Sequence, residues 1–282
     1  MARKHIPLAI AYDFDGTLSP GYMQNYDFIP ALGMKPKAFW NEVKELAKGQ
    51  QGDEILIYMG QMLRKADAAA VPVTRIAFEA FGATVDLFDG VAGWFKRIDS
   101  YARKREVRVE HFIISSGLRE MIAGTPIARH FKAIFASGFW YDQHKVARFP
   151  AMAVNYTTKT QYLFRINKGN LDVWDHTTIN EYVSPADRST PFTNMVFIGD
   201  GETDIPCFRL VKDQGGHSIA VYRPRVHSKG KKYAERLIEQ GRVHFALPAN
   251  YREGGELDIA VKRIVDKMAA DGELNRLGKA IY

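Results

Sequence analysis

The stretch AYDFDGTLSP, residues 11–20, places two aspartates on alternate positions at the end of an apolar run. The run, residues 6–12, has the length and composition of a buried strand that ends at Asp13. Burying even one charge near a core strand is costly, so two carboxylates followed at once by a glycine and a threonine need a chemical reason. Polar groups in comparable positions elsewhere in the chain would supply that reason.

The composition is typical of a soluble globular protein. Hydrophobic residues make up 46% and charged residues 25% of the 282 positions, as in ordinary folded domains. No stretch approaches the ~20 apolar residues that a helix needs to span a bilayer, which predicts no membrane partner. The apolar run after the basic residues 1–5 is too short for a signal peptide. The single cysteine, Cys207, excludes an internal disulfide framework and is compatible with the cytoplasmic location that we expect.

The chain is basic, with 39 Lys and Arg against 32 Asp and Glu and a formal net charge of +7. Such a surface could attract nucleic acid or phosphorylated metabolites. The positive residues form no long block, and their densest groups, 103–108 and 229–232, are typical of solvated helix ends or loops. We therefore interpret the charge as a general contribution to solubility, and nucleic acid is not the expected partner.

Strand and helix patterns alternate along most of the chain, which predicts an α/β fold with a Rossmann-like, doubly wound, mainly parallel sheet. Residues 20–88 are helical in pattern throughout and are predicted to form a small helical cap domain inserted after the first strand, with a core of residues 1–19 and 89–282. The expected strands are 6–12, 107–114, 195–198, 218–222 and 243–247, with a hairpin in 133–149. The expected helices are 37–48, 53–66, 74–81, 91–104, one around 118, 158–167 and 258–270.

Four polar features follow the expected strands or open the expected helices. The strands that end at Tyr12, Ile114 and Ile198 would carry Asp13–Asp15, Ser115–Ser116 and Asp200 to the same edge of the sheet. In open α/β sheets, ligands bind outside the carboxyl ends of the strands. The convergence of these residues predicts a site in one crevice.

The motif DFDGT, residues 13–17, together with GDGETD, residues 199–204, resembles the haloacid dehalogenase-like (HAD) phosphohydrolase superfamily. The resemblance extends from about residue 6 to residue 222. The order of motifs matches as well: a hydrophobic strand ending in serine, a lysine that opens a helix, and an acidic G-D-x3-D loop. A calcium loop of the D-x-D-G type is disfavoured, because the glutamate at its twelfth position is missing.

The resemblance implies a Mg²⁺-dependent phosphatase. Asp13 would be the nucleophile that forms an aspartyl-phosphate, and Asp15 would be the general acid and then the general base. The metal would be held by the side chains of Asp13 and Asp200 and by the backbone carbonyl of Asp15. Two carboxylates would then stand together because they share a cation and because one attacks while the other moves a proton.

The remaining site residues are also implied by the resemblance. Thr17, Ser115, Ser116 and Gly117 would bind the phosphoryl oxygens, the last two through amides at a helix amino terminus. We favour Ser115 over Ser116 as the hydroxyl donor. The lysine that balances the developing charge would be Lys159, with Lys145 and Lys168 as alternatives. Asp204 would orient Lys159 or a metal-bound water and would not contact Mg²⁺ directly. Family phosphatases often have asparagine where this chain has Thr203, which affects a contact to substrate or water and not the metal.

The position of the predicted helical insertion is that of a phosphoserine-phosphatase-type cap, which would exclude water and contact the leaving group. Tyr22, Met23, Gln24 and Tyr26 are candidate substrate contacts on this cap, although packing roles fit them equally. The expected substrate is a small phosphorylated metabolite. A phosphotransferase using the same site, and a phosphate- or nucleic-acid-binding protein of low turnover, stay open as alternatives, and the sequence does not set an oligomeric state.

Overall fold

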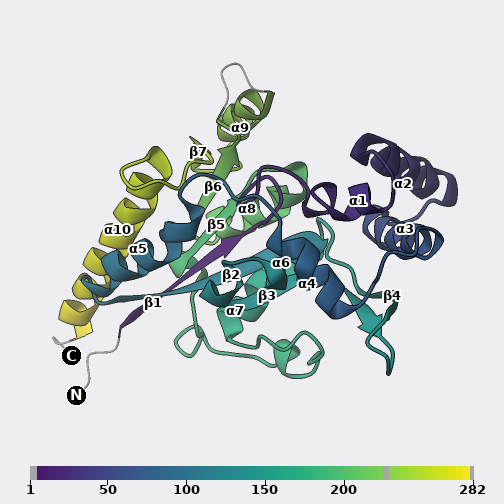
Figure 1. Cartoon of the computed structure of the whole chain (residues 1–282). Coiled ribbons are helices and arrows are strands. Elements are labelled where there is room, and N and C mark those ends of the chain that lie inside the picture. The colour runs from purple at the N-terminus through teal and green to yellow at the C-terminus, as the bar shows by residue number, and fades with distance from the viewer. Residues whose placement is uncertain (1–4, 225–228, 280–282) are drawn as a thin grey trace.

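A computed structural model of the chain describes residues 5–224 and 229–279, and in this part seven strands form one sheet in the order β4-β3-β2-β1-β5-β6-β7 (Figure 1). Neighbouring strands run parallel, except that β3 and β4 form an antiparallel hairpin at one edge. The strands are β1 Ile6–Tyr12, β2 Val107–Leu118, β3 Phe131–Tyr141, β4 Ala147–Met152, β5 Met195–Gly199, β6 His217–Tyr222 and β7 Phe245–Pro248.

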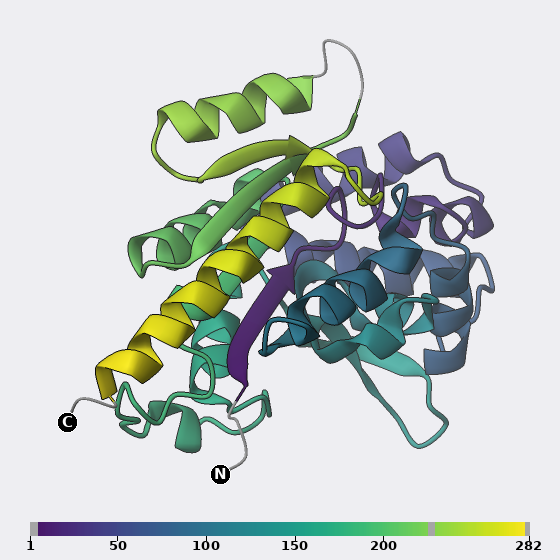
Figure 2. The same cartoon turned by 90° about the vertical axis from the view of Figure 1, so that its left-hand side faces the viewer.

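Helices cover both faces of the sheet. Figure 2 shows α10 (Glu256–Lys279) and α5 (Val91–Arg103) crossing one face. The other face packs against α7 (Lys159–Lys168), α8 (Ile205–Asp213) and α9 (Lys229–Glu239). The sheet is therefore the middle of three layers, as expected for the α/β class with a Rossmann-like doubly wound sheet, which the structure confirms.

The central strand β1 shows why its sequence is apolar without interruption. Leu8, Ile10 and Tyr12 belong to the core that includes α5 and α10, whereas Ala9 and Ala11 belong to the core on the opposite face. Successive side chains of a strand point to opposite faces, so a strand covered on both sides needs apolar residues at every position. The first polar side chain therefore comes at the strand's end.

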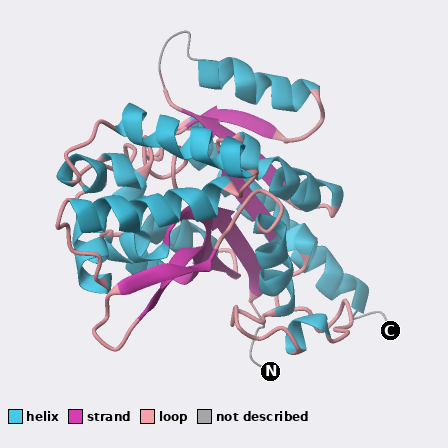
Figure 3. Ribbon diagram, turned by 90° about the vertical axis from the view of Figure 1, so that its right-hand side faces the viewer, coloured by secondary structure: helices cyan, strands magenta, loops and turns pink. Residues whose placement is uncertain are grey.

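The segment between β1 and α5 is helical. Its elements are η1 Met23–Asn25, α1 Phe28–Ala31, α2 Pro36–Gln50, α3 Glu54–Ala68 and α4 Arg75–Ala83. Figures 1 and 3 show α2 and α3 packed side by side beyond one end of the sheet. In contrast, α4 packs directly on α6 (Arg119–Gly124), so closely that a Cβ on Gly82 would lie 1.9 Å from the Met121 carbonyl oxygen. The limits of a separate cap domain at residues 20 and 88 stay a prediction.

Most expected elements are present with small shifts in their ends, although α10 runs to Lys279 where an end at 270 was expected, and α9 was not expected. One expectation is wrong in a way that matters for the site. The second strand was expected to end at Ile114 and to lead into a helix, but β2 runs through Leu118 and α6 begins only at Arg119. The strand continues because Leu118 still pairs with Ser137 of β3 across an irregular register. None of the helices in the described ranges combines the length and apolar character needed to cross a membrane.

Candidate active site

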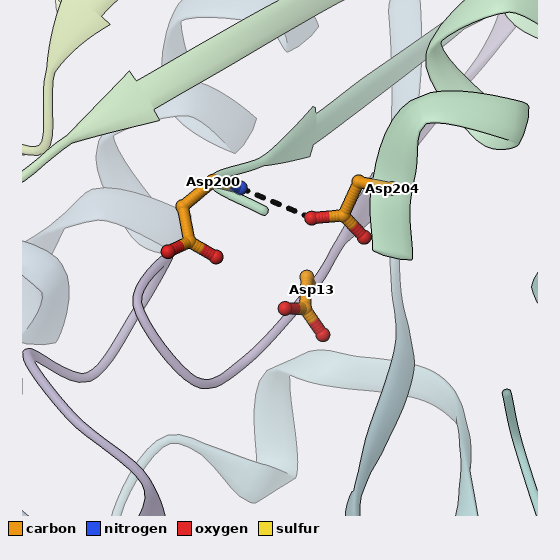
Figure 4. A group of neighbouring side chains, drawn as sticks. All are labelled: Asp13, Asp200 and Asp204. Carbon is orange, nitrogen blue, oxygen red and sulfur yellow. Dashed lines mark hydrogen bonds between the residues drawn. The ribbon is translucent and has the colours of Figure 1, made fainter. Parts of the chain in front are cut away.

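The carboxyl ends of the adjacent strands β1 and β5 bring the first two aspartates together. Asp13 directly follows β1, and its amide donates a 2.9 Å hydrogen bond to the carbonyl of Ile198 in β5. Asp200 directly follows β5. Figure 4 shows these two side chains beside Asp204, with the backbone amide of Asp200 bonded to it, and one carboxylate oxygen from each of the three residues lies within 4.8 Å of the others.

Asp204 is held by its own loop. It is fully buried at the end of η5 (Glu202–Asp204), and its Oδ2 accepts hydrogen bonds from the amides of Asp200 and Gly201, both at 3.1 Å. Its Oδ1 accepts a bond from the Lys159 ammonium at 2.7 Å. Both oxygens of Asp204 are therefore engaged, one by the Lys159 ammonium and one by two backbone amides. That Asp204 orients a neighbouring group stays a prediction.

Lys159 is the lysine that the structure brings to the carboxylates. It is the first residue of α7 and is fully buried, with its Nζ 3.0 Å from Asp13 Oδ1 and 2.7 Å from Asp204 Oδ1. Burial alone would lower its pKa, but the two carboxylates raise the pKa of Lys159 well above its ordinary value. Of the alternatives, Lys145 lies in the β3–β4 turn and Lys168 donates to the carbonyls of Ile179 and Glu181.

The cluster holds more negative charge than one lysine can balance. Burial raises the pKa of Asp13 to about 6, although Lys159 opposes the shift. Burial and the nearby Asp13 also raise the pKa values of Asp15 and Asp200 well above their ordinary range. Excess buried carboxylate with hard oxygen donors is the environment that suits Mg²⁺. Asp13 and Asp200 fit such an ion best, since both oxygens of Asp204 are already engaged.

Asp15 lies apart from the three-carboxylate cluster. Its Oδ1 accepts a 2.9 Å hydrogen bond from the amide of Met23 in η1, so its side chain is held toward the helical segment. Gly117 of β2 approaches the same place: a Cβ there would lie 2.2 Å from Met23 Cε and 3.2 Å from Asp15 Oδ2. The site thus contains one carboxyl group that is separated from the three-carboxylate cluster and kept next to the helical segment.

Close backbone approach explains the glycine of the first motif. Gly16 has φ +78°, in the left-handed region, and a Cβ at this position would lie 2.0 Å from Asp200 Oδ2. No L-residue with a side chain could satisfy both constraints. The turn after Asp15 can therefore pass close to the second aspartate only because residue 16 is glycine.

The end of β2 supplies hydroxyl groups. The Ser115 hydroxyl accepts a 3.1 Å bond from the Gly117 amide and can still donate its own hydrogen. The Oγ atoms of Thr17 and Ser116 are buried, and neither has a hydrogen-bond partner in the described part of the chain. The expectation that the Ser116 and Gly117 amides stand at a helix amino terminus is wrong, because both residues belong to β2.

The four cap candidates have different surroundings. Met23 and Gln24 are buried, and the Met23 sulfur accepts a 3.3 Å bond from the Leu118 amide. Tyr26 is hydrogen-bonded to Ser19 at 3.2 Å. Tyr22 is half exposed, and the carboxylates of Asp15, Asp200, Glu54 and Asp13 add to burial in raising its pKa. Tyr22 is thus the exposed side chain of the four, and it lies close to the acidic site.

Sequence reasoning missed three residues that contact the site. Tyr58 of α3 donates a 2.8 Å hydrogen bond to the Ser116 carbonyl, and the Trp40 ring packs between the Tyr58 and Tyr22 rings at 5.6 and 5.1 Å. Tyr251, fully buried, donates a 2.9 Å bond to the Thr17 carbonyl. No local motif marks them, because each reaches the site only through the packing of a distant segment.

Comparison with known proteins identifies the family. Residues 10–209 match the haloacid dehalogenase-like hydrolase family, which is most of the chain. The chain is 30% identical over 277 residues to an uncharacterized protein of Borreliella burgdorferi, with 89% of this chain and 93% of that protein covered. The protein therefore belongs to the haloacid dehalogenase-like hydrolases.

Solved structures share the fold at low identity. A HAD family hydrolase from Salmonella enterica serovar Typhi is 17% identical, with a TM-score of 0.57 and with 92% of this chain and 72% of that chain covered. A substrate-bound phosphoserine phosphatase is 15% identical, with a TM-score of 0.52 and with 85% and 92% covered. At this level of identity the similarity establishes the fold and leaves the substrate open.

Proposed function

We propose that the protein is a Mg²⁺-dependent phosphatase that hydrolyses a small phosphomonoester through an aspartyl-phosphate on Asp13. The observation that carries the proposal is the arrangement around that carboxylate. Asp13 pairs with Lys159 at 3.0 Å and lies beside Asp200, whereas Asp15 is held separately by the Met23 amide. Family membership supports a hydrolase, and the location of the reaction in the cytoplasm stays a prediction.

In the first step an Asp13 carboxylate oxygen attacks phosphorus, and the bond from phosphorus to the ester oxygen breaks. Asp15 donates its proton to that leaving oxygen, for which its raised pKa suits it. Lys159 and the hydroxyls of Thr17, Ser115 and Ser116 contact the phosphoryl oxygens. Mg²⁺, held by Asp13, Asp200 and the Asp15 carbonyl, would offset the repulsion between the carboxylates and the anionic substrate.

In the second step a water attacks phosphorus and gives its proton to the Asp15 carboxylate. The bond between phosphorus and the Asp13 oxygen breaks, which releases inorganic phosphate and regenerates both aspartates. Asp204 keeps Lys159 oriented throughout, because its own position is fixed by the amides of Asp200 and Gly201. The reaction thus consumes one water and returns every protein group to its starting state.

The leaving group would contact the aromatic residues Tyr22, Trp40 and Tyr58. The three rings form a row with Trp40 in the middle. Tyr22, at one end, precedes Met23, whose amide binds Asp15, and Tyr58, at the other end, donates a hydrogen bond to the Ser116 carbonyl. The proton donor and the aromatic rings are therefore on the same side of the site. A Tyr22→Ala variant would be expected to change the ranking of substrates more than the rate of the best one.

The decisive experiment measures phosphate release from a panel of phosphorylated metabolites, in Mg²⁺ and in chelator, for the wild-type protein and for Asp13→Asn. We expect Mg²⁺-dependent release that falls by at least about a thousandfold in the variant, since the nucleophile is lost. Asp15→Asn should be slow with alkyl esters and less impaired with a p-nitrophenyl ester, whose leaving oxygen needs no proton.

Other outcomes would point to the alternatives. Transfer of phosphate to an added alcohol in preference to water would indicate a phosphotransferase. A folded wild-type protein that releases phosphate from no compound in Mg²⁺ would contradict the proposal and favour a phosphate- or nucleic-acid-binding role.

A further inference from the structure

The amino-terminal part of α3 is hydrogen-bonded to the core at two places beside the site. The Asn155 side-chain amide donates a 2.9 Å bond to Asp53 Oδ2, immediately before α3 begins. One turn further on, Tyr58 donates to the Ser116 carbonyl at 2.8 Å. The first of these bonds joins the helical segment to the turn that leads into α7 and hence to Lys159.

Asn155 organises the turn that leads into α7. Its Oδ1 accepts bonds from the amides of Thr157 and Thr158, at 3.2 and 3.0 Å, and its carbonyl accepts from the amide of Lys159 at 3.0 Å. These bonds also fix which side-chain atom is the oxygen, because only an oxygen can accept from two amides. The NH₂ group of Asn155 must therefore point toward Asp53.

The two carboxylate oxygens of Asp53 also have separate partners, one local and one across the site. Its Oδ1 caps α3 by accepting bonds from the amides of Ile55 and Leu56, at 2.8 and 3.1 Å, which leaves Oδ2 for Asn155. Asp53 thus uses one oxygen to cap α3, Asn155 uses its oxygen to hold the turn before α7, and each uses its other side-chain atom to reach across. The bond between the two residues has a fixed direction, from the amide of one to the carboxylate of the other.

We propose that Asp53 and Asn155 are positioning residues, which tie the helical segment to the start of α7 and thereby hold Lys159 against Asp13 when the segment is closed over the site. The proposal rests on the function proposed above. Through this pair, closure of the segment and alignment of the phosphate-binding lysine become one event. Neither residue touches the reacting atoms.

The chemistry of the pair allows a test by exchange of the two residues. Asp53→Asn keeps the oxygen that caps α3 but places an NH₂ group opposite the NH₂ group of Asn155. Asn155→Asp keeps the oxygen that accepts from the Thr157 and Thr158 amides but places two carboxylate oxygens opposite each other. The double variant Asp53→Asn/Asn155→Asp restores one donor and one acceptor, with the bond reversed, while the local bonds of both residues are retained.

Two measurements should be made on the four proteins. The first is kcat and KM for p-nitrophenyl phosphate in Mg²⁺. The second is hydrogen–deuterium exchange of the backbone amides in residues 54–58 and 159–163, which does not depend on turnover. Each single variant should lose about five- to twentyfold in kcat/KM, the size expected when a hydrogen bond is replaced by two opposed like groups. Both segments should exchange faster, and the double variant should return to within about twofold of the wild type.

A matched control changes another cap of the same helical segment, one that pairs with Val146 of the core through its backbone while its side chain only caps a helix. Thr74 caps α4 by accepting from the Ala77 amide at 3.2 Å, so Thr74→Asn should leave kcat/KM and the exchange of 159–163 unchanged. A double variant no better than the worse single variant would overturn the proposal, as would single variants indistinguishable from the wild type. If the wild type hydrolyses nothing, the proposed function fails, and the exchange data alone decide whether the pair couples the two segments.

Discussion

Asp13 and Asp258 are both almost wholly buried carboxylates, at 6% and 1% exposure, and they differ in what surrounds them. Asp258, near the start of α10, is paired with Arg97 at 2.9 Å and Lys262 at 2.8 Å, and it accepts from the Gly254 amide. Asp13 shares Lys159 with Asp204 and has Asp200 as a further acidic neighbour.

The pKa values of the two residues move in opposite directions. Hydrogen bonds from Lys262, Gly254 and Arg97 outweigh burial and lower the pKa of Asp258, whereas burial raises that of Asp13 to about 6. Cations that match a buried carboxylate stabilise the fold, and carboxylates in excess of cations cost stability unless a ligand completes the site. This difference separates a structural ion cluster from a candidate active site.

Removal of Lys159 should have the largest effect, because the Asp13 cluster would lose the cation that pairs with Asp13 and Asp204. Lys159→Met should lower the unfolding free energy in chelator by about 3–5 kcal/mol, because Asp13 and Asp204 would face each other without a cation. Phosphatase activity should fall by at least about a hundredfold. Urea unfolding and phosphate release measure the two effects, and a variant as stable as the wild type in chelator would contradict the charge argument.

Asp258→Asn should affect stability and spare the reaction. We expect the unfolding free energy to fall by about 1–3 kcal/mol, since the charge-assisted bonds from Arg97 and Lys262 are weakened. In the folded protein kcat/KM should stay within about threefold of the wild type. Asp13→Asn should have the opposite effects. Its activity should be abolished, and its unfolding free energy in chelator should be equal to or above that of the wild type.

Mg²⁺ should stabilise only the cluster with excess carboxylate. Binding of the ion at millimolar concentration should stabilise the folded protein by about 1–2 kcal/mol, which should raise the melting temperature by a few degrees. Addition of chelator should reverse this increase. Asp200→Asn should remove most of this increase in melting temperature. Asp258→Asn should have a lower melting temperature without the ion but should show the same increase when Mg²⁺ is added. A shift that persists in Asp200→Asn would place the ion elsewhere.

The pH dependence of stability should have opposite signs for the two aspartates. Asp13 has a folded pKa above its unfolded value of about 3.9, so its stabilising contribution is lost as the pH rises from about 4 to 6. Asp258 has a folded pKa below that value, so its contribution is lost as the pH falls below about 4.

Urea unfolding in chelator between pH 3 and 7 tests both signs. Asp13→Asn should flatten the loss of stability on the neutral side, and Asp258→Asn should flatten the loss on the acid side. The same flattening in both variants would mean that general charge repulsion, and not these two residues, sets the profile.

Much of the site could be predicted from the sequence because the polar residues follow directly after apolar strands. An apolar run buried on both faces must end before its first charge, so Asp13 and Asp200 mark strand ends by themselves. The start of α7 at Lys159 and the cap of α3 at Asp53 were predictable for a similar reason, since helix starts have local signals. The end of β2 was not, because its extension to Leu118 depends on pairing with Ser137 of β3.

The sequence by itself determined the α/β class, and it placed Asp13 and Asp200 directly after apolar strands and Lys159 at the start of a helix. These are consequences of local periodicity and of short-range capping. The tertiary structure alone decided that Tyr58, Trp40 and Tyr251 reach the site, that Asp204 accepts a bond from Lys159, and that Asp53 is bonded to Asn155. Such contacts join residues far apart in the chain, and only the packing of the whole molecule brings them within bonding distance.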